Sequence, residues 1–136
     1  MSLEGGCYCG AVRYKADGEP MMKAECFCRE CQYITGGGGL VVMAMPAAGF
    51  EITKGKVKGY KRADLEHGVT REFCENCGTH LTTRAPGFEQ AVILKVGSLD
   101  DPSVFGKADT ANFACDAQSY HRLPNDIPVF QKWMRD

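Results

Sequence analysis

The chain has 136 residues, of which 44% are hydrophobic and 24% are charged, and its formal net charge is −1. This length supports one domain with its own hydrophobic core, and the composition is ordinary for a soluble globular protein. The near-neutral charge argues against a nucleic-acid-binding domain, because such domains usually carry a basic excess. We therefore expect a single domain over residues 1–136 and no nucleic-acid partner.

Short apolar segments, interrupted by glycine, proline and aspartate, predict strands along most of the chain. In chain order we expect strands at Ala11–Lys15, Met22–Glu25, Leu40–Met45, Phe50–Thr53, Val57–Arg62, Val69–Phe73, His80–Arg84 and Ala91–Val96. One helical turn is expected after Cys28, running toward the glycines of Thr35–Gly39, and a second short helix is expected around Val129–Arg135. Many short strands at close spacing favour an all-β, mainly antiparallel domain with few short helices.

No segment of the sequence approaches the roughly 18 apolar residues of a membrane-spanning helix. The N-terminus carries neither the basic region nor the apolar region of a signal peptide. We therefore expect a cytoplasmic protein with no membrane partner, in a reducing compartment where thiols persist. Its eight cysteines are then better explained as metal ligands or redox groups than as structural disulfides.

Cys74 and Cys77 form a C-x-x-C pair that is followed by Gly78. Such a knuckle directs two sulfurs at one ion, backbone N–H groups face the sulfurs, and the glycine can adopt a positive φ. A closed tetrahedral zinc site needs two more ligands, which Cys7 and Cys9 can supply because the residue between them points away. The four cysteines predict a structural zinc site. A redox pair at the knuckle, or another pairing of the cysteine clusters, is the alternative.

Cys26, Cys28 and Cys31 form a third cluster with C-x-C-x-x-C spacing. Three protein ligands with an open fourth position are the pattern of catalytic zinc. Cys115 could instead complete a closed four-cysteine site, although it has no cysteine nearby in sequence and free cysteines are commonly buried. The spacing matches neither ferredoxin pattern, and a thiol–disulfide exchange centre is a further alternative. The number and spacing of the cysteines leave a closed second site nearly as plausible as an open one.

Four segments in order, GGCYCGAVRY, ECFCRECQYITG, FCENCGTHL and VGSLDDP, resemble the glutathione-dependent formaldehyde-activating enzyme family, which includes relatives of centromere protein V. The resemblance extends from Gly6 to about Pro102 and continues loosely to Trp133. It implies a β-tent fold of packed antiparallel sheets and two zinc ions per chain. It also implies a structural zinc on Cys7, Cys9, Cys74 and Cys77, and a catalytic zinc on Cys26, Cys28 and Cys31.

The resemblance implies that a thiol such as glutathione condenses with formaldehyde or a related small carbonyl to give S-hydroxymethylglutathione, with a carbon–sulfur lyase step in reverse. An open zinc site is thiophilic, so a substrate thiol can become the fourth ligand and lose its proton. Three thiolates and Zn²⁺ carry a net charge of about −1, which favours holding the thiol over strong polarisation of the carbonyl. The competing interpretation is a non-catalytic binding domain with two closed four-cysteine sites.

Other polar residues have a structural and a functional interpretation. Lys54, Lys56 and Lys58 recur at period two, which is typical of a solvated edge and could also attract an anionic thiol. Arg29 lies inside the cysteine loop, where it can balance charge. His80 follows the knuckle and is expected to be an ordinary strand residue, with a base or a fourth ligand as the alternative. The C-terminal segment ANFACDAQSYHRLP departs from the family pattern, which leaves the substrate open.

Overall fold

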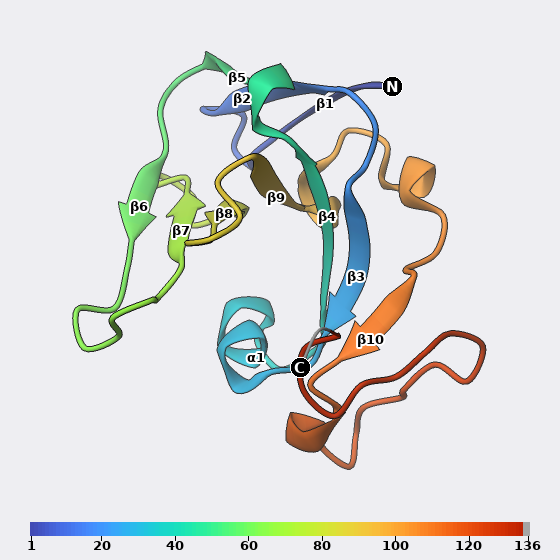
Figure 1. Cartoon of the computed structure of the whole chain (residues 1–136). Helices are drawn as coiled ribbons and strands as arrows, with labels where there is room; N and C mark the ends of the chain where they lie inside the picture. The colour runs from blue at the N-terminus through green and yellow to red at the C-terminus, as the bar shows by residue number, and fades with distance from the viewer. Residues whose placement is uncertain (135–136) are drawn as a thin grey trace.

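The computed structural model describes residues 1–134, and strands dominate that range (Figure 1). The strands are β1 (Ser2–Gly6), β2 (Arg13–Asp17), β3 (Met22–Cys26), β4 (Leu40–Pro46), β5 (Phe50–Lys54), β6 (Lys58–Tyr60), β7 (Thr70–Phe73), β8 (His80–Arg84), β9 (Ala91–Lys95) and β10 (Thr110–Asn112). The helices are α1 (Arg29–Thr35) and the 3-10 turns η1 (Ala47–Gly49), η2 (Val96–Ser98), η3 (Pro102–Phe105) and η4 (Ala114–Asp116). The predicted all-β class is confirmed.

The strands form two sheets. The larger sheet has the order β10-β3-β4-β9-β8-β7-β6, and the smaller one has the order β1-β2-β5. Neighbouring strands are antiparallel except β10 and β3, which are parallel. The turn η1 carries the chain from β4 into β5, and therefore from one sheet to the other. Gly49 is required in this turn, because a Cβ there would lie 2.0 Å from the carbonyl oxygen of Asp17.

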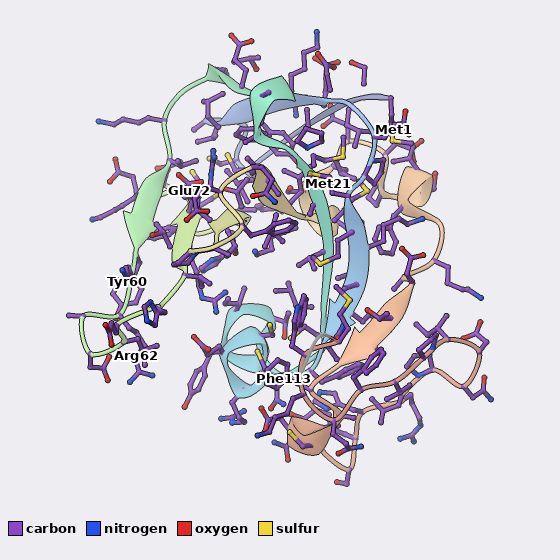
Figure 2. All side chains as sticks on the ribbon, in the orientation of Figure 1. Met1, Met21, Tyr60, Arg62, Glu72 and Phe113 are labelled. Carbon is purple, nitrogen blue, oxygen red and sulfur yellow. The ribbon has the colours of Figure 1, made fainter. Side chains whose placement is uncertain are left out.

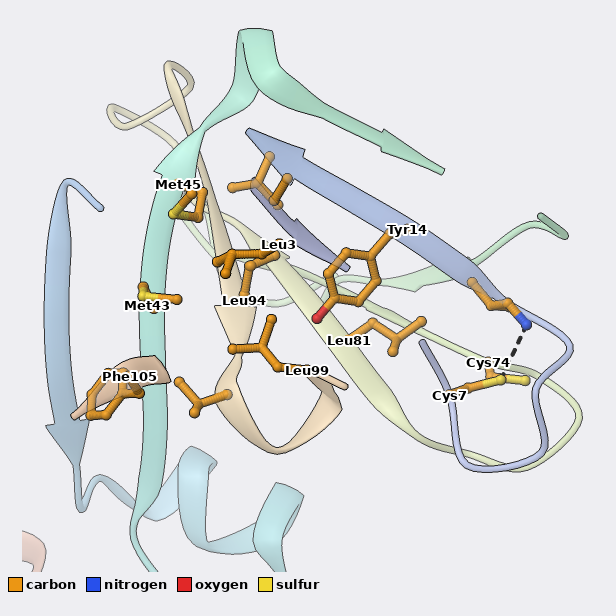
Figure 3. Packing of buried hydrophobic residues seen from close by; sticks show 14 of the residues in the cluster. Leu3, Cys7, Tyr14, Met43, Met45, Cys74, Leu81, Leu94, Leu99 and Phe105 are labelled. Atoms are coloured by element: carbon orange, nitrogen blue, oxygen red, sulfur yellow. Dashed lines mark hydrogen bonds between the residues drawn. The ribbon is translucent and has the colours of Figure 1, made fainter. Parts of the chain in front are cut away.

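The main hydrophobic core lies between the two sheets, as Figure 3 shows. Met43 and Met45 project from β4 into this core, while Val42 projects to the opposite face of the same sheet. Both faces of β4 are therefore covered, which explains why the strand is apolar along its length. Tyr14 from the smaller sheet is fully buried, and its hydroxyl hydrogen-bonds to Ser98 Oγ at 2.7 Å.

A second apolar cluster lies on the other face of the larger sheet, under α1. It joins Cys31 of the helix to Cys26 and Val42 of the sheet, with Ile34 packed against it. The helix ends at Gly36 in the left-handed conformation, as the glycine run predicts. Burial of one face of α1 against the sheet therefore places two of the three clustered cysteines at the helix–sheet contact.

All eight predicted strands occur, with small differences at their ends, whereas β1 and β10 were not predicted. The strand β1 escapes detection because SLEGG has little apolar alternation. The helix predicted around Val129–Arg135 is wrong as far as Met134; Arg135 lies outside the described residues. Val129 instead forms a parallel bridge to Ala111, so pairing with the edge of the sheet satisfies this backbone in place of a helix. No helix in residues 1–134 is long and apolar enough to cross a membrane.

Candidate metal centres

The two cysteine pairs of the predicted four-cysteine site lie together in the structure. The sulfurs of Cys7, Cys9, Cys74 and Cys77 all lie within 4.8 Å of one another. The Sγ–Sγ distance is 3.6 Å between Cys7 and Cys9 and 3.8 Å between Cys9 and Cys74. A tetrahedral zinc with Zn–S bonds of about 2.3 Å separates its sulfurs by about 3.8 Å. The donor set and its spacing therefore fit a closed zinc site.

Local hydrogen bonds hold this group in place. The N–H of Val12 donates to Cys7 Sγ at 3.2 Å, and the side-chain amide of Asn76 donates to Cys9 Sγ at 3.2 Å. Thr79 joins the two halves, because its Oγ1 accepts from the N–H of Tyr8 at 3.1 Å. N–H groups directed at sulfur stabilise the thiolate form, which is the form that binds metal.

The knuckle has the backbone that its sequence predicts. Gly78 has a φ of +81°, and its N–H donates to the carbonyl of Cys74 at 2.8 Å. The hydroxyl of Thr79 lies 3.1 Å from Cys77 Sγ. Hydrogen bonds from the Thr79 hydroxyl and N–H lower the pKa of Cys77 to about 5. The knuckle thus offers a thiolate at neutral pH before any ion is bound.

The three-cysteine cluster forms where β3 ends and α1 begins. Cys26 is the last residue of β3, Cys28 is the N-cap of α1, and Cys31 lies in the first turn. Their sulfurs all lie within 4.8 Å, and those of Cys28 and Cys31 are 3.1 Å apart. Among residues 1–134, no fourth cysteine, histidine, aspartate or glutamate belongs to this group. Three soft donors can hold one metal ion and leave a coordination position for another molecule.

Hydrogen bonding gives the three thiols unequal acidity. Cys28 accepts from the N–H of Cys31 at 3.3 Å, and Cys28 is partly exposed while the other two are buried. Hydrogen bonds with Cys26 and Cys31 lower the pKa of Cys28. The hydrogen bond with Cys28 raises the pKa of Cys26, and hydrogen bonds with Cys26 first and Cys28 second raise the pKa of Cys31. Of the three thiols, Cys28 therefore loses its proton most readily.

Two cavities lie beside α1 and share part of their walls, although none of the three clustered cysteines lines either of them. One, of about 420 Å³, lies between α1 and the β6–β7 region and is lined by Tyr33, Tyr60 and Arg71 among others. Figure 2 shows Tyr60 at the lower end of β6. The other, of about 320 Å³, lies between the end of α1 and the end of β9. Ile34 and His80 line both.

The C-terminal part of the chain braces the start of α1. The amide of Gln32, which is 2% exposed, donates to the carbonyls of Phe27 at 2.8 Å and Asp116 at 2.9 Å. The N–H of Arg29 donates to Asp116 Oδ2 at 3.2 Å, and His121 Nε2 lies 2.6 Å from the carbonyl oxygen of Gly37. The segment that departs from the family pattern therefore positions the helix that carries Cys28 and Cys31.

Comparison with known proteins agrees with these features. A family model described as glutathione-dependent formaldehyde-activating enzyme matches residues 2–117, a range that holds all eight cysteines. The chain belongs to the glutathione-dependent formaldehyde-activating enzyme family. A Halomonas elongata protein named for this family is 31% identical over 106 residues, which are 74% of this chain and 67% of that protein. A crystal structure of a Rhodobacter sphaeroides protein has the same fold, with a TM-score of 0.62 at 17% identity, and the match covers 78% of this chain and 97% of that one.

Two charged residues near the three-cysteine cluster, Lys95 and Arg71, were not predicted from the sequence to have a functional role. Lys95 is buried, and burial first and the charge of Arg71 second lower the pKa of Lys95 to about 7. Arg71 forms an ion pair with Glu30 of α1 at 3.3 Å. A signal for Lys95 was present, because a single lysine interrupts the apolar segment AVILKVG.

His80 is a strand residue as expected, but its Nδ1 is buried without a hydrogen-bond partner in residues 1–134.

If each cysteine group holds one zinc ion, replacing Cys115 with serine should leave both ions in place. Cys115 is exposed, its sulfur lies outside both cysteine groups, and its thiol makes a long contact of 3.8 Å with Asp116 Oδ1. Exposed substitutions of this kind change stability by about 0.5 kcal/mol or less. Zinc analysis and thermal unfolding of the variant test this. Loss of one zinc would mean that Cys115 closes the second site.

Proposed function

We propose that this family member is a zinc-dependent enzyme of the cytoplasm that joins a thiol to formaldehyde or a related small carbonyl. Glutathione is the thiol that the family name supports, and the reverse reaction is a carbon–sulfur lyase step. The proposal rests on the group of Cys26, Cys28 and Cys31, which offers three soft ligands and includes no fourth cysteine, histidine, aspartate or glutamate in residues 1–134. We assign the four-cysteine group to a structural zinc.

Zinc on three thiolates would supply a thiophilic open position that takes up a substrate thiol and favours its thiolate. The residues around the cluster then have defined tasks. Burial of Cys26 and Cys31 against the sheet keeps bulk water from two sides of the cluster, while the partial exposure of Cys28 leaves one approach for a substrate. Gln32 and the C-terminal segment hold α1, and with it two of the three ligands, against β3.

The larger cavity suits the rest of a peptide-sized thiol. Its walls include Tyr33, Tyr60, Arg62 and Arg71, so it combines aromatic surface with two guanidinium groups. Glutathione carries two carboxylates, and arginine is the side chain that binds carboxylates most specifically. Arg62 is paired with Asp64 in an exposed ion pair, which contributes little, and Arg71, whose side chain is 16% exposed, is paired with Glu30 of α1. A bound carboxylate would have to compete with both pairs.

X-ray absorption at the zinc edge tests the proposal directly. Addition of millimolar glutathione to the zinc-loaded protein should raise the mean number of sulfur ligands from about 3.5 to about 4 per zinc, because one of the two sites gains a thiolate. S-methylglutathione, which has no thiol, should leave the spectrum unchanged. An unchanged spectrum with glutathione as well would point to a different thiol or to a non-catalytic domain.

A further inference from the structure

Lys95 is the only formally charged side chain that is buried within residues 1–134, with 5% of its surface exposed. Its ammonium hydrogen-bonds to Thr83 Oγ1, and none of the ion pairs formed in that range includes it. An ammonium has three donors, so the protein satisfies this one incompletely. Burying a cation without a carboxylate partner is strongly destabilising. Groups of this kind concentrate at functional sites.

The register of the larger sheet puts Lys95 on the same face as the three-cysteine cluster. Lys95 pairs with Val42 on β4, and Val42 pairs with Ala24 on β3. Paired residues project to the same face, and Cys26 follows Ala24 by two residues along β3. Lys95 and Cys26 therefore share the face that α1 covers. The positive charge of Lys95 is attracted to the thiolate forms of Cys31 and Cys26.

Lys95 also lines the smaller of the two cavities. Ile34, Gly39 and Leu40 form an apolar part of its wall, and His80 contributes a buried Nδ1 that has no hydrogen-bond partner in residues 1–134. Leu40 is the strand partner of Cys26, and Ile34 packs against the same apolar cluster as the cysteines. The cavity thus lies next to the cysteine cluster and opens on a cation, whereas the larger cavity lies on the other side of Ile34 and His80.

Two adjoining cavities that share Ile34 and His80 match a reaction of two substrates. Building on the proposed thiol–carbonyl function, we propose that the smaller cavity receives the small carbonyl and that Lys95 is the catalytic acid that protonates its oxygen. A metal–thiolate cluster that is itself negative polarises a carbonyl weakly, so the positive charge for this oxygen has to come from elsewhere. Lys95 is the buried cation on this face that can provide it.

The step balances without any further reactant. A lone pair of the substrate thiolate forms the new carbon–sulfur bond, the π pair of the carbonyl moves to oxygen, and the oxygen takes a proton from the Lys95 ammonium. The resulting amine recovers a proton that the next thiol releases on binding, so thiol and carbonyl combine with no net gain or loss. In the lyase direction the amine removes the hydroxyl proton and the same bonds break in reverse.

Reductive methylation tests whether a small carbonyl reaches Lys95, without reference to activity. The full-length, zinc-loaded protein would be treated with formaldehyde and cyanoborohydride at neutral pH, and modified lysines located by tandem mass spectrometry. Lys95 should be methylated at least as fast as the exposed Lys132, and the same protein treated with benzaldehyde should react at Lys132 and the other exposed lysines but not at Lys95. If Lys95 stays unmodified after Lys132 has reacted completely, the cavity does not admit the carbonyl and the inference is overturned.

The variant Lys95→Met tests the chemical role. Exchange NMR of glutathione, formaldehyde and their adduct should show a rate reduced by about 100-fold, with zinc content and the KM for glutathione unchanged. Methylamine should restore part of the rate, because it can replace the missing ammonium in the cavity. Lys132→Met is the control and should behave like the original chain. If Lys95→Met does not fold, Lys95→Gln, which keeps a polar hydrogen-bonding group, takes its place.

The outcomes separate the two proposals. If the original chain forms no adduct and the glutathione spectrum at the zinc edge is unchanged, the proposed function fails, and the role of Lys95 fails with it. If the original chain is active and the Lys95 variant stays within about threefold of it, the function stands and the role assigned to Lys95 is wrong. A parallel loss of zinc and of activity in the variant would also overturn the catalytic role, because it would make Lys95 a structural support of the cysteines.

Discussion

Replacing Cys74 with serine should unfold the domain and release the zinc that we propose for the four-cysteine site. Cys74 is 1% exposed and belongs to the main core, where it lies beside Cys7 (Figure 3). Binding of a structural zinc is worth about 10–16 kcal/mol in small domains, which is as large as the whole stability of a typical domain of about 5–15 kcal/mol. The variant should also bury a hydroxyl among sulfurs that no longer have an ion to neutralise them.

Circular dichroism and zinc analysis of the Cys74→Ser variant measure this effect. The original chain treated with a strong chelator should unfold in the same way, which separates loss of metal from the substitution itself. Cys115→Ser, at an exposed position outside both groups, is the matched control and should keep its fold. A Cys74→Ser protein that retains a cooperative thermal transition and both zinc ions would refute a structural role for the four-cysteine site.

Replacing Cys28 with serine should remove one zinc and abolish adduct formation while the domain stays folded. Cys28 is partly exposed, and its sulfur caps α1 by accepting from the N–H of Cys31. Serine is among the best N-cap residues, so the hydroxyl should preserve this hydrogen bond and the helix. It is a poor zinc ligand in its neutral form, so the three-cysteine site should lose its ion and the reaction rate should fall by at least about 100-fold.

Three measurements test the Cys28→Ser variant: zinc content, exchange NMR of the thiol adduct and thermal unfolding. We expect one zinc per chain, no detectable adduct formation and a thermal midpoint within a few degrees of the original, since about 1 kcal/mol shifts the midpoint of a domain of this size by roughly 4 °C. If Cys28→Ser and Cys74→Ser lose stability to the same extent, the division into a catalytic and a structural site is wrong.

Local sequence predicts each half of the metal sites, because the spacing of the cysteines within a turn decides where their sulfurs point. The C-x-x-C-G knuckle of Cys74 and Cys77 needs only its own backbone, and the positive φ of Gly78 follows from that requirement. Most strands are likewise local: their apolar segments are bounded by turn residues, and eight were located from the sequence. The strands β1 and β10 were missed because long-range pairing, and little in their own composition, makes them strands.

Only the tertiary structure decides which cysteine clusters combine into one site. Cys7 and Cys74 are far apart in sequence and meet in the core that lies between the two sheets, while Cys115 lies exposed outside both groups. The burial of Lys95 is also a tertiary effect, because its place beside Cys26 depends on the register of three strands. The sequence by itself determined that three cysteines lie together without a fourth nearby along the chain. Only the packing of α1 on the sheet decided what surrounds them, because the two cavities and the buried cation are contributed by segments distant in sequence.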